Sequence, residues 1–451
     1  MRKIAVVIGT RPEAIKCAPV IRALRDDPRF TPIVLSTGQH RQMLDETLQA
    51  FGIKPDTDLN VMTERQTLSQ ITHRVLDGLA GWLAACSVEA VMVHGDTATT
   101  LVGGLAGFHQ QVPVVHIEAG LRSGNLYSPF PEEANRRLVA QIAELHLAPT
   151  PGNAANLIRE GIKESKIVVT GNTVIDALRW AASRPIGYGH PALADLDDDP
   201  RKVVLASAHR RESWPLLPRI GEALRDIAAD GDVRVVVPLH RNPIVREALL
   251  PKIAGLPNIT VVDPLPYLHF CRLMLRSDII LSDSSGAEEE GPALGKPTLV
   301  LRDVTERPEA IAAGTARLVG RTRERITEEV TTLLGDEVRY QQMAAPANTY
   351  GDGRASERVV GALAHFFGEG PAVMPFVPGG DFASQDSRPA QAPSSPPEKG
   401  RRSNERRAQR RQTPRDEWSV DRRQDRPSAE ELSDRRADRR GEPEPDPGLR
   451  R

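Results

Sequence analysis

The chain has 451 residues and a formal net charge of -1, with 59 Lys and Arg against 60 Asp and Glu. This balance gives no argument for a nucleic-acid partner, and the length allows two domains with sizeable cores and a tail. The three cysteines, Cys17, Cys86 and Cys271, lie far apart, which argues against a disulfide framework or a zinc cluster. We found no apolar run long enough for a membrane span or a signal peptide, and we therefore expect a cytoplasmic protein.

Short apolar strands alternate with amphipathic helices along most of the chain. In the first part we expect strands at 4–8, 32–36, 90–94, 112–117, 145–148 and 167–170. A stretch rich in Pro, Gly and Asp at 184–200 is typical of a linker, and further strands are expected at 202–207, 233–238, 259–262, 278–281 and 298–301. This alternation predicts an α/β protein with two Rossmann-like, doubly wound parallel sheets, in domains 1–183 and 184–368. Ligands should bind at the carboxyl ends of the strands.

The composition changes at about residue 369, where Pro, Ser, Arg, Asp and Glu begin to dominate and apolar residues nearly vanish. Such a segment cannot bury enough apolar surface to offset its chain entropy, so we expect a disordered tail over 369–451. Its repeated Arg pairs could contact RNA or an anionic lipid, but the interleaved acidic residues favour a solvated tail.

Two strand-to-helix turns, one in each half, are suited to binding phosphate. The first is Gly9-Thr10-Arg11-Pro12-Glu13, in which Thr10 and Glu13 fit a capping box and Arg11 and Lys16 add positive charge. The second runs from Ser282 to Glu290 and offers hydroxyls and the free N–H groups of a first helical turn. Its Ser285 and Glu288 also fit a capping box. A pair of such turns suggests a ligand held between two domains.

Charged and polar residues gather at other strand ends and at one helix start, namely Asp96, Glu118, Glu132 and His209. If they line one cleft, their carboxylates can exchange protons with a substrate once burial tunes them. Alternatively, Asp96 and Glu132 cap helices, Glu118 pairs with Arg122, and His209 is an ordinary turn residue. Four such residues across both halves favour the functional interpretation.

Other chemistries have less support. The sequence has no Gly-x-Gly-x-x-Gly fingerprint, no P-loop and no Gly-x-Ser-x-Gly nucleophile elbow. His94 and Asp96 lack the companions that a metal site needs. The polar stretch from Gln39 to Gln42 is either a second ligand site or a solvated turn.

The motifs together resemble those of the non-hydrolysing UDP-N-acetylglucosamine 2-epimerases, over about residues 3–366. The matching motifs are Gly9-Thr10-Arg11-Pro12-Glu13-Ala14-Ile15-Lys16, His94-Gly95-Asp96-Thr97, Glu118-Ala119-Gly120-Leu121-Arg122, Pro131-Glu132-Glu133-Ala134-Asn135-Arg136, Gly171-Asn172-Thr173-Val174-Ile175-Asp176, His209-Arg210-Arg211-Glu212 and Thr305-Glu306-Arg307-Pro308-Glu309. The resemblance implies a GT-B-like fold with the active site in the cleft between its two domains. It also implies interconversion of UDP-GlcNAc and UDP-ManNAc through a 2-acetamidoglucal intermediate, without a redox cofactor or metal, and a homodimer.

The same resemblance implies roles for individual residues. The catalytic candidates are Asp96, Glu118, Glu132 and His209. The substrate-binding candidates are Arg11, Lys16, Arg136, Ser284, Ser285, Gly286, Glu290 and Arg307, with Glu290 at the uridine ribose. The residues of an implied allosteric UDP-GlcNAc site are Gln39, Gln42, Arg210 and His240.

Two residues depart from the family pattern, because Ser285 and Glu288 stand where the family usually has Gly and Gln. Ser285 adds a side chain and Glu288 adds negative charge beside an expected phosphate, so weaker UDP binding is expected. This departure keeps open a nucleotide-sugar-binding protein without catalysis. A second alternative is a hydrolysing relative that releases free ManNAc and UDP.

Overall fold

The computed structural model describes residues 1–38, 41–61, 66–345 and 348–379, with only the backbone of 41–43. Its first lobe is built on a seven-stranded parallel sheet in the order β3-β2-β1-β4-β5-β6-β7. The strands are β1 (Arg2–Ile8), β2 (Phe30–Ser36), β3 (Thr57–Asp58), β4 (Ala90–His94), β5 (Val114–Ile117), β6 (Leu145–Ala148) and β7 (Ile167–Val169). The helices of this lobe are α1 (Arg11–Asp26), α2 (Arg41–Ala50), α3 (Leu68–Ala85), α4 (Ala98–His109), α5 (Glu132–Ile142) and α6 (Pro151–Arg159).

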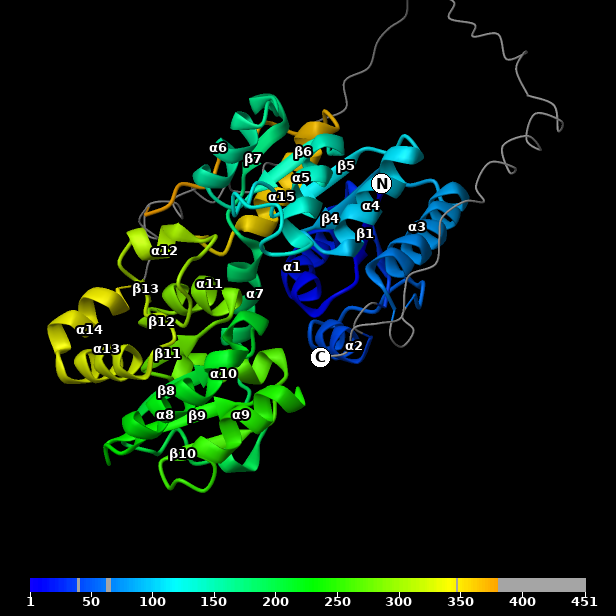
Figure 1. The fold of residues 1–451 in the computed structure, drawn as a ribbon. Coiled ribbons are helices and arrows are strands. Elements are labelled where there is room, and N and C mark those ends of the chain that lie inside the picture. Colours follow the sequence, from blue (N-terminus) through cyan, green and yellow to red (C-terminus); the bar gives the residue numbers. More distant parts are fainter. Residues whose placement is uncertain (39–40, 62–65, 346–347, 380–451) are drawn as a thin grey trace, which may run out of the picture. The chain divides into compact units, whose positions relative to one another are not determined.

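The second lobe is built on a six-stranded parallel sheet in the order β10-β9-β8-β11-β12-β13. Its strands are β8 (Lys202–Ser207), β9 (Val233–Pro238), β10 (Ile259–Val262), β11 (Ile279–Ser282), β12 (Thr298–Val300) and β13 (Ala316–Leu318). Its helices are α8 (Leu217–Ala228), α9 (Pro243–Ile253), α10 (Tyr267–Arg276), α11 (Ser285–Ala293), α12 (Pro308–Ala312), α13 (Arg323–Gly335) and α14 (Glu337–Ala344). Helix α7 (Thr173–Ala182) lies between the two lobes (Figure 1).

The predicted fold class, two Rossmann-like domains in a GT-B-like arrangement, is confirmed. Helices cover both faces of each parallel sheet, so most residues of the longer strands are apolar. In β1, for example, each residue from Ile4 to Ile8 is at most 1% exposed. Strands β3 and β13 were not predicted, because their residues, Thr57-Asp58 and Ala316-Arg317-Leu318, form no apolar run. No helix in the described ranges is long and apolar enough to cross a membrane.

The stretch at 184–200, expected to be a linker, packs on the second lobe instead. Leu193 and Leu196 are fully buried there. The carboxylate of Asp199 lies 2.9 Å from the buried guanidinium of Arg234 on β9. The composition of this stretch therefore indicated irregular structure, while its few apolar residues still dock on the core.

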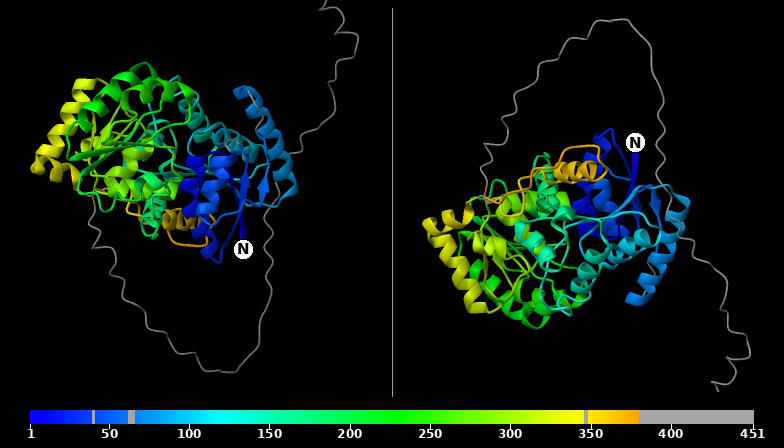
Figure 2. Two further views of the ribbon diagram at one scale, coloured as in Figure 1. Left: turned by 90° about the horizontal axis from the view of Figure 1, so that it is seen from below. Right: turned by 90° about the horizontal axis from the view of Figure 1, so that it is seen from above.

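The last described segment returns to the first lobe. Helix α15 (Ala355–Phe366) packs against α1 and α7 although it comes last in the sequence (Figures 1 and 2). Beyond it, Phe376 is 3% exposed and its N–H group donates to the carbonyl of Val169 at 2.8 Å. The packed structure therefore continues past the predicted boundary at 368, because Phe376 supplies apolar area that the rest of the tail lacks. The remainder of that predicted tail, 380–451, lies outside the described residues.

Candidate active site

Most of the predicted site residues follow the strands at which each sheet changes its winding direction. In the first sheet these strands are β1 and β4, and in the second they are β8 and β11. At such switch points the loops diverge on opposite faces of the sheet and leave a crevice for a ligand. Arg11 follows β1, Asp96 follows β4, His209 follows β8 and Ser284 follows β11.

A buried carboxylate holds the two loops of the first switch point together. Glu13, which is 2% exposed, accepts the N–H groups of Gly9 at 2.8 Å and Thr10 at 2.7 Å. It also accepts the hydroxyl of Thr97 at 2.6 Å, and Thr97 follows β4. The predicted capping box of Thr10 and Glu13 is confirmed. Burial raises the pKa of Glu13, although these donors oppose the rise. The sequence predicted the capping box within α1, but it did not indicate the contact between Glu13 and Thr97.

Charges from both lobes meet in what we call the interlobe charge cluster: Lys16, Glu118, Glu289 and Arg307. The ammonium of Lys16 pairs with Glu118 of its own lobe and lies 3.0 Å from a carboxylate oxygen of Glu289 on α11. The Nε atom of Arg307 donates to the other oxygen of Glu289 at 2.6 Å. The four side chains are at most 11% exposed. Two cations and two anions thus neutralise one another away from water.

Glu118 has an unusual backbone and a strongly perturbed carboxyl group. Its φ of 61° is in the left-handed region, where a non-glycine residue is strained, as often happens at functional sites. Asn172 donates to its carboxylate at 3.1 Å, and His94 lies 3.6 Å from it. Burial alone would raise the pKa of Glu118, but Lys16, His94 and Arg307 together hold it well below its usual range. Glu118 is therefore kept ionised.

The other two candidate carboxylates lie at the start of α5 and beside it. Arg136 pairs with Asp96, donating from Nε at 3.0 Å, and with Glu133 at 3.1 Å. Asn135 donates to the backbone carbonyl of Asp96 at 2.8 Å. Burial, with a contribution from the charge of Asp96, raises the pKa of Glu132. Glu132 and Glu118 thus have pKa values shifted in opposite directions.

In the second lobe a fully buried carboxylate orients His209. Asp283 accepts the backbone N–H groups of His209 and Arg210, both at 2.9 Å, and lies 3.5 Å from the imidazole of His209. The ring of His240 stacks on that of His209 with centroids 5.4 Å apart. The structure therefore brings two allosteric candidates, Arg210 and His240, beside a catalytic one. Of the other two, Gln39 and the side chain of Gln42 lie outside the described residues.

The phosphate turn differs in detail from the prediction. Helix α11 begins at Ser285 and its N-cap is Ser284, whose N–H group donates to the hydroxyl of Ser282 at 3.0 Å. The predicted capping box of Ser285 and Glu288 is therefore wrong. The carboxylate of Glu288 instead accepts the hydroxyl of Thr305 at 2.6 Å and lies 3.6 Å from Arg302. These two partners draw Glu288 away from the helix N-terminus.

Glu290 is buried six residues beyond this cap. The hydroxyl of Tyr267 donates to its carboxylate at 2.7 Å, and burial raises the pKa of Glu290 to about 7. A Cβ atom added at Gly286 would lie 3.1 Å from the other carboxylate oxygen, so glycine keeps this approach open.

The alternative pairing of Glu118 with Arg122 is wrong, because Arg122 pairs with Glu160 at 2.6 Å. Among the residues that the structure describes, no group of three His, Cys, Asp or Glu side chains could hold a metal ion. Sequence analysis also missed Glu289, since it lies in a run of three glutamates that are all buried and local pattern does not distinguish them.

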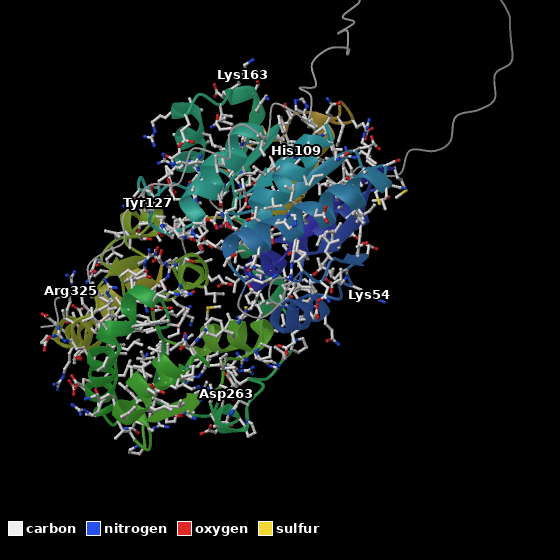
Figure 3. The ribbon with its side chains drawn as sticks, turned by 45° about the vertical axis from the view of Figure 1, so that its right-hand side comes forward. Lys54, His109, Tyr127, Lys163, Asp263 and Arg325 are labelled. Carbon is white, nitrogen blue, oxygen red and sulfur yellow. The ribbon has the colours of Figure 1, made fainter. Side chains whose placement is uncertain are left out.

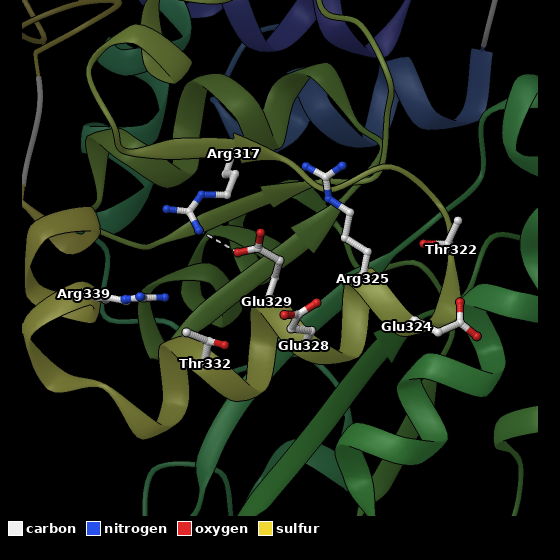
Figure 4. Close-up of a pocket in the computed structure, with 8 residues that line it drawn as sticks. All are labelled: Arg317, Thr322, Glu324, Arg325, Glu328, Glu329, Thr332 and Arg339. Atoms are coloured by element: carbon white, nitrogen blue, oxygen red, sulfur yellow. Dashed lines mark hydrogen bonds and ion pairs between the residues drawn. The ribbon is translucent and has the colours of Figure 1, made fainter.

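A surface hollow of about 380 Å³ lies apart from these residues, along α13 of the second lobe (Figure 4). Its Arg317 and Glu329 pair with each other at 2.6 Å. Arg325, which also lines it, lies on the outer side of the second lobe (Figure 3). None of the predicted site residues lines this hollow, and its charges are solvated side chains of one helix and its neighbours.

Comparisons with known proteins agree on one family. A family model described as UDP-N-acetylglucosamine 2-epimerase matches residues 22–364, from within α1 to within α15. The Escherichia coli (strain K12) UDP-N-acetylglucosamine 2-epimerase is 49% identical over 368 residues, which are 80% of this chain and 98% of that protein. The crystal structure of UDP-GlcNAc 2-epimerase from Neisseria meningitidis bound to UDP-GlcNAc has 45% identity and a TM-score of 0.77, covering 80% of this chain and 100% of that one. A S. aureus MnaA-UDP co-structure has 42% identity and a TM-score of 0.77, covering 83% and 100%.

Proposed function

The chain belongs to the UDP-N-acetylglucosamine 2-epimerase family and is an isomerase, and we propose that it interconverts UDP-GlcNAc and UDP-ManNAc without net hydrolysis. In the proposed reaction a base takes the C2 proton while the bond from C1 to UDP breaks, and its electron pair leaves with the diphosphate. UDP and 2-acetamidoglucal result. A proton then returns to C2 on the opposite face, and UDP adds back at C1. The relatives solved with UDP-GlcNAc or UDP support a nucleotide sugar as the ligand.

The observation that carries this proposal is the interlobe charge cluster. Lys16 and Arg307 approach from different lobes, and both are buried where the switch-point loops converge. Buried cations of this kind stabilise the negative charge that develops as a diphosphate leaves. The N-terminus of α11, capped at Ser284, adds backbone N–H groups suited to phosphate.

The two shifted carboxyl groups suggest how the protons move. A carboxylate held ionised suits a base, and a carboxyl with a raised pKa suits an acid. We therefore assign the first proton abstraction in the forward direction to Glu118 and the return of a proton to Glu132, with the roles exchanged in the reverse direction. Asp96 is the third acid/base candidate, and its ion pair with Arg136 orients it. We also propose that His209, which Asp283 orients, contacts the diphosphate.

Proton NMR of UDP-GlcNAc in deuterated water tests the reaction and separates it from its alternatives. We expect deuterium at C2 of both UDP-GlcNAc and UDP-ManNAc, because the abstracted proton exchanges with solvent before it returns. Accumulation of free ManNAc and UDP in place of UDP-ManNAc would instead identify a hydrolysing enzyme. Unchanged UDP-GlcNAc at high protein concentration would identify a binding protein without catalysis.

Three further expectations accompany this proposal. We propose that the chain forms a homodimer and acts in the cytoplasm. We also propose that Arg210 and His240 contribute to a second nucleotide-sugar site. The stacking of His240 on His209 supports that last point, because it gives such a site a direct contact with a catalytic candidate.

A further inference from the structure

Glu289 is the member of the interlobe charge cluster that contacts both of its cations. One oxygen of its carboxylate lies 3.0 Å from Lys16 and the other accepts from Arg307 at 2.6 Å. The side chain is 2% exposed. Lys16 comes from α1 of the first lobe, whereas Glu289 is on α11 of the second. Glu289 therefore holds in place two cations from different lobes.

Lys16 is shared between two carboxylates, and this sharing affects Glu118. Besides Lys16, the groups that face Glu118 are His94 at the end of β4, Asn172 before α7 and the more distant charge of Arg307. His94 is buried, and burial lowers its pKa, although the charge of Glu118 opposes this fall. The pKa of Glu118 therefore depends on how strongly Lys16 and Arg307 also interact with Glu289.

We propose that Glu289 is a positioning residue for the epimerisation, which engages Lys16 and Arg307 and so weakens their hold on Glu118, the base assigned to the C2 proton. The inference rests on the proposed function. It adds that, before substrate binds, the carboxylate of Glu289 occupies the position beside Lys16 and Arg307 that the diphosphate of the substrate would take. A bound diphosphate must compete with Glu289 for the same two cations. The site then gives up some affinity for UDP in exchange for a more reactive base.

The variant Glu289→Gln tests this charge balance. It keeps the shape of the side chain but leaves two cations facing one anion, Glu118, in a buried cluster. Glu118 is then stabilised as a carboxylate and becomes a weaker base, while the excess positive charge attracts a diphosphate. We expect turnover to fall by roughly three- to tenfold, as Brønsted behaviour of a weakened base implies. We expect the Kd for UDP at low salt to fall by about tenfold, the effect of one nearby charge, and the gain to shrink as salt is added.

Slower turnover combined with tighter UDP binding distinguishes a positioning role from general damage to the fold. A variant that is merely misfolded loses turnover and also binds UDP more weakly. Asp176→Asn is the matched control, since Asp176 is a buried carboxylate that accepts the N–H groups of Ala355 and Ser356 away from the cluster. It should lower the melting temperature without tightening UDP binding. Glu289→Asp, which keeps the charge, should return the Kd for UDP towards that of the native chain.

Calorimetric titration of UDP and the C2 exchange assay are run on the full chain and on all three variants. Unchanged turnover in Glu289→Gln, or UDP binding that is equal to or weaker than that of the native chain, would overturn the inference. Absence of C2 exchange in the native chain would instead count against the proposed function. In that case the UDP titrations would still decide whether Glu289 competes with a diphosphate.

Discussion

Replacing Glu290 with glutamine should flatten the pH dependence of the protein's stability. Burial raises the pKa of Glu290 from 4.5 to about 7 in the folded chain, whereas in the unfolded chain the carboxyl ionises near 4.5. Between these values the folded state binds a proton that the unfolded state has lost, so its stability falls as the pH rises and stays low above about 7. A shift of this size corresponds to about 3 kcal/mol. Glu290 is 5% exposed, so solvent screens little of this cost.

The Glu290→Gln side chain keeps its shape and still accepts the hydroxyl of Tyr267, but it cannot ionise. Urea unfolding of both chains at about pH 5 and about pH 8 should show the variant gaining about 2.5 kcal/mol over the native chain between the two conditions, since part of the shift lies below pH 5. Other titrating groups contribute equally to both chains and cancel in the difference. A difference in unfolding free energy that does not change with pH would refute the reasoning. Tyr267→Phe removes the hydrogen bond to the ionised carboxylate, so it should make the native pH dependence steeper.

Three other outcomes are expected. Turnover should drop by at least about a hundredfold in each of the variants Asp96→Asn, Glu118→Gln and Glu132→Gln. The exposed Asp263 (Figure 3) provides a matched Asp→Asn control that should keep full turnover; near-native rates in all three would remove the acid/base assignment. Ending the chain after residue 379 should leave the melting temperature unchanged, while ending it after 368 should cost about 2 kcal/mol through loss of buried Phe376; equal melting curves would show that this contact contributes nothing. Glu288→Gln should change the Kd for UDP by less than about threefold, or about 0.7 kcal/mol, because Arg302 and Thr305 hold its carboxylate; a tenfold tightening would mean that its charge reaches the ligand.

The strands were the most predictable feature, because most of them are largely apolar runs between helices. The expected bounds of β4, β6, β8, β9 and β10 agree with the structure residue for residue. A strand buried on both faces is apolar at most positions, so its composition marks it even where a paired polar residue such as Arg234 interrupts the run. Strands β3 and β13 leave no such signal, because a charged residue stands in each and neither has an apolar run. The positions of the site turns followed from the same pattern, since ligand sites lie at the carboxyl ends of parallel strands.

The sequence by itself determined which loops hold the candidate site residues, because Gly, Ser and charged residues directly after an apolar strand can be identified without knowing the fold. It also determined the capping of α1, because Thr10 and Glu13 are three residues apart and interact within one helical turn. Only the tertiary structure decided the partners of the buried charges. Glu288, Glu289 and Glu290 are consecutive, yet they contact Thr305, Lys16 with Arg307, and Tyr267 respectively. Lys16 and Glu289 are 273 positions apart, and their contact depends on how α1 and α11 are brought together by two separate sheets. Local patterns report on neighbours along a helix or strand, whereas the energy of a buried charge depends on whichever side chains the fold places beside it.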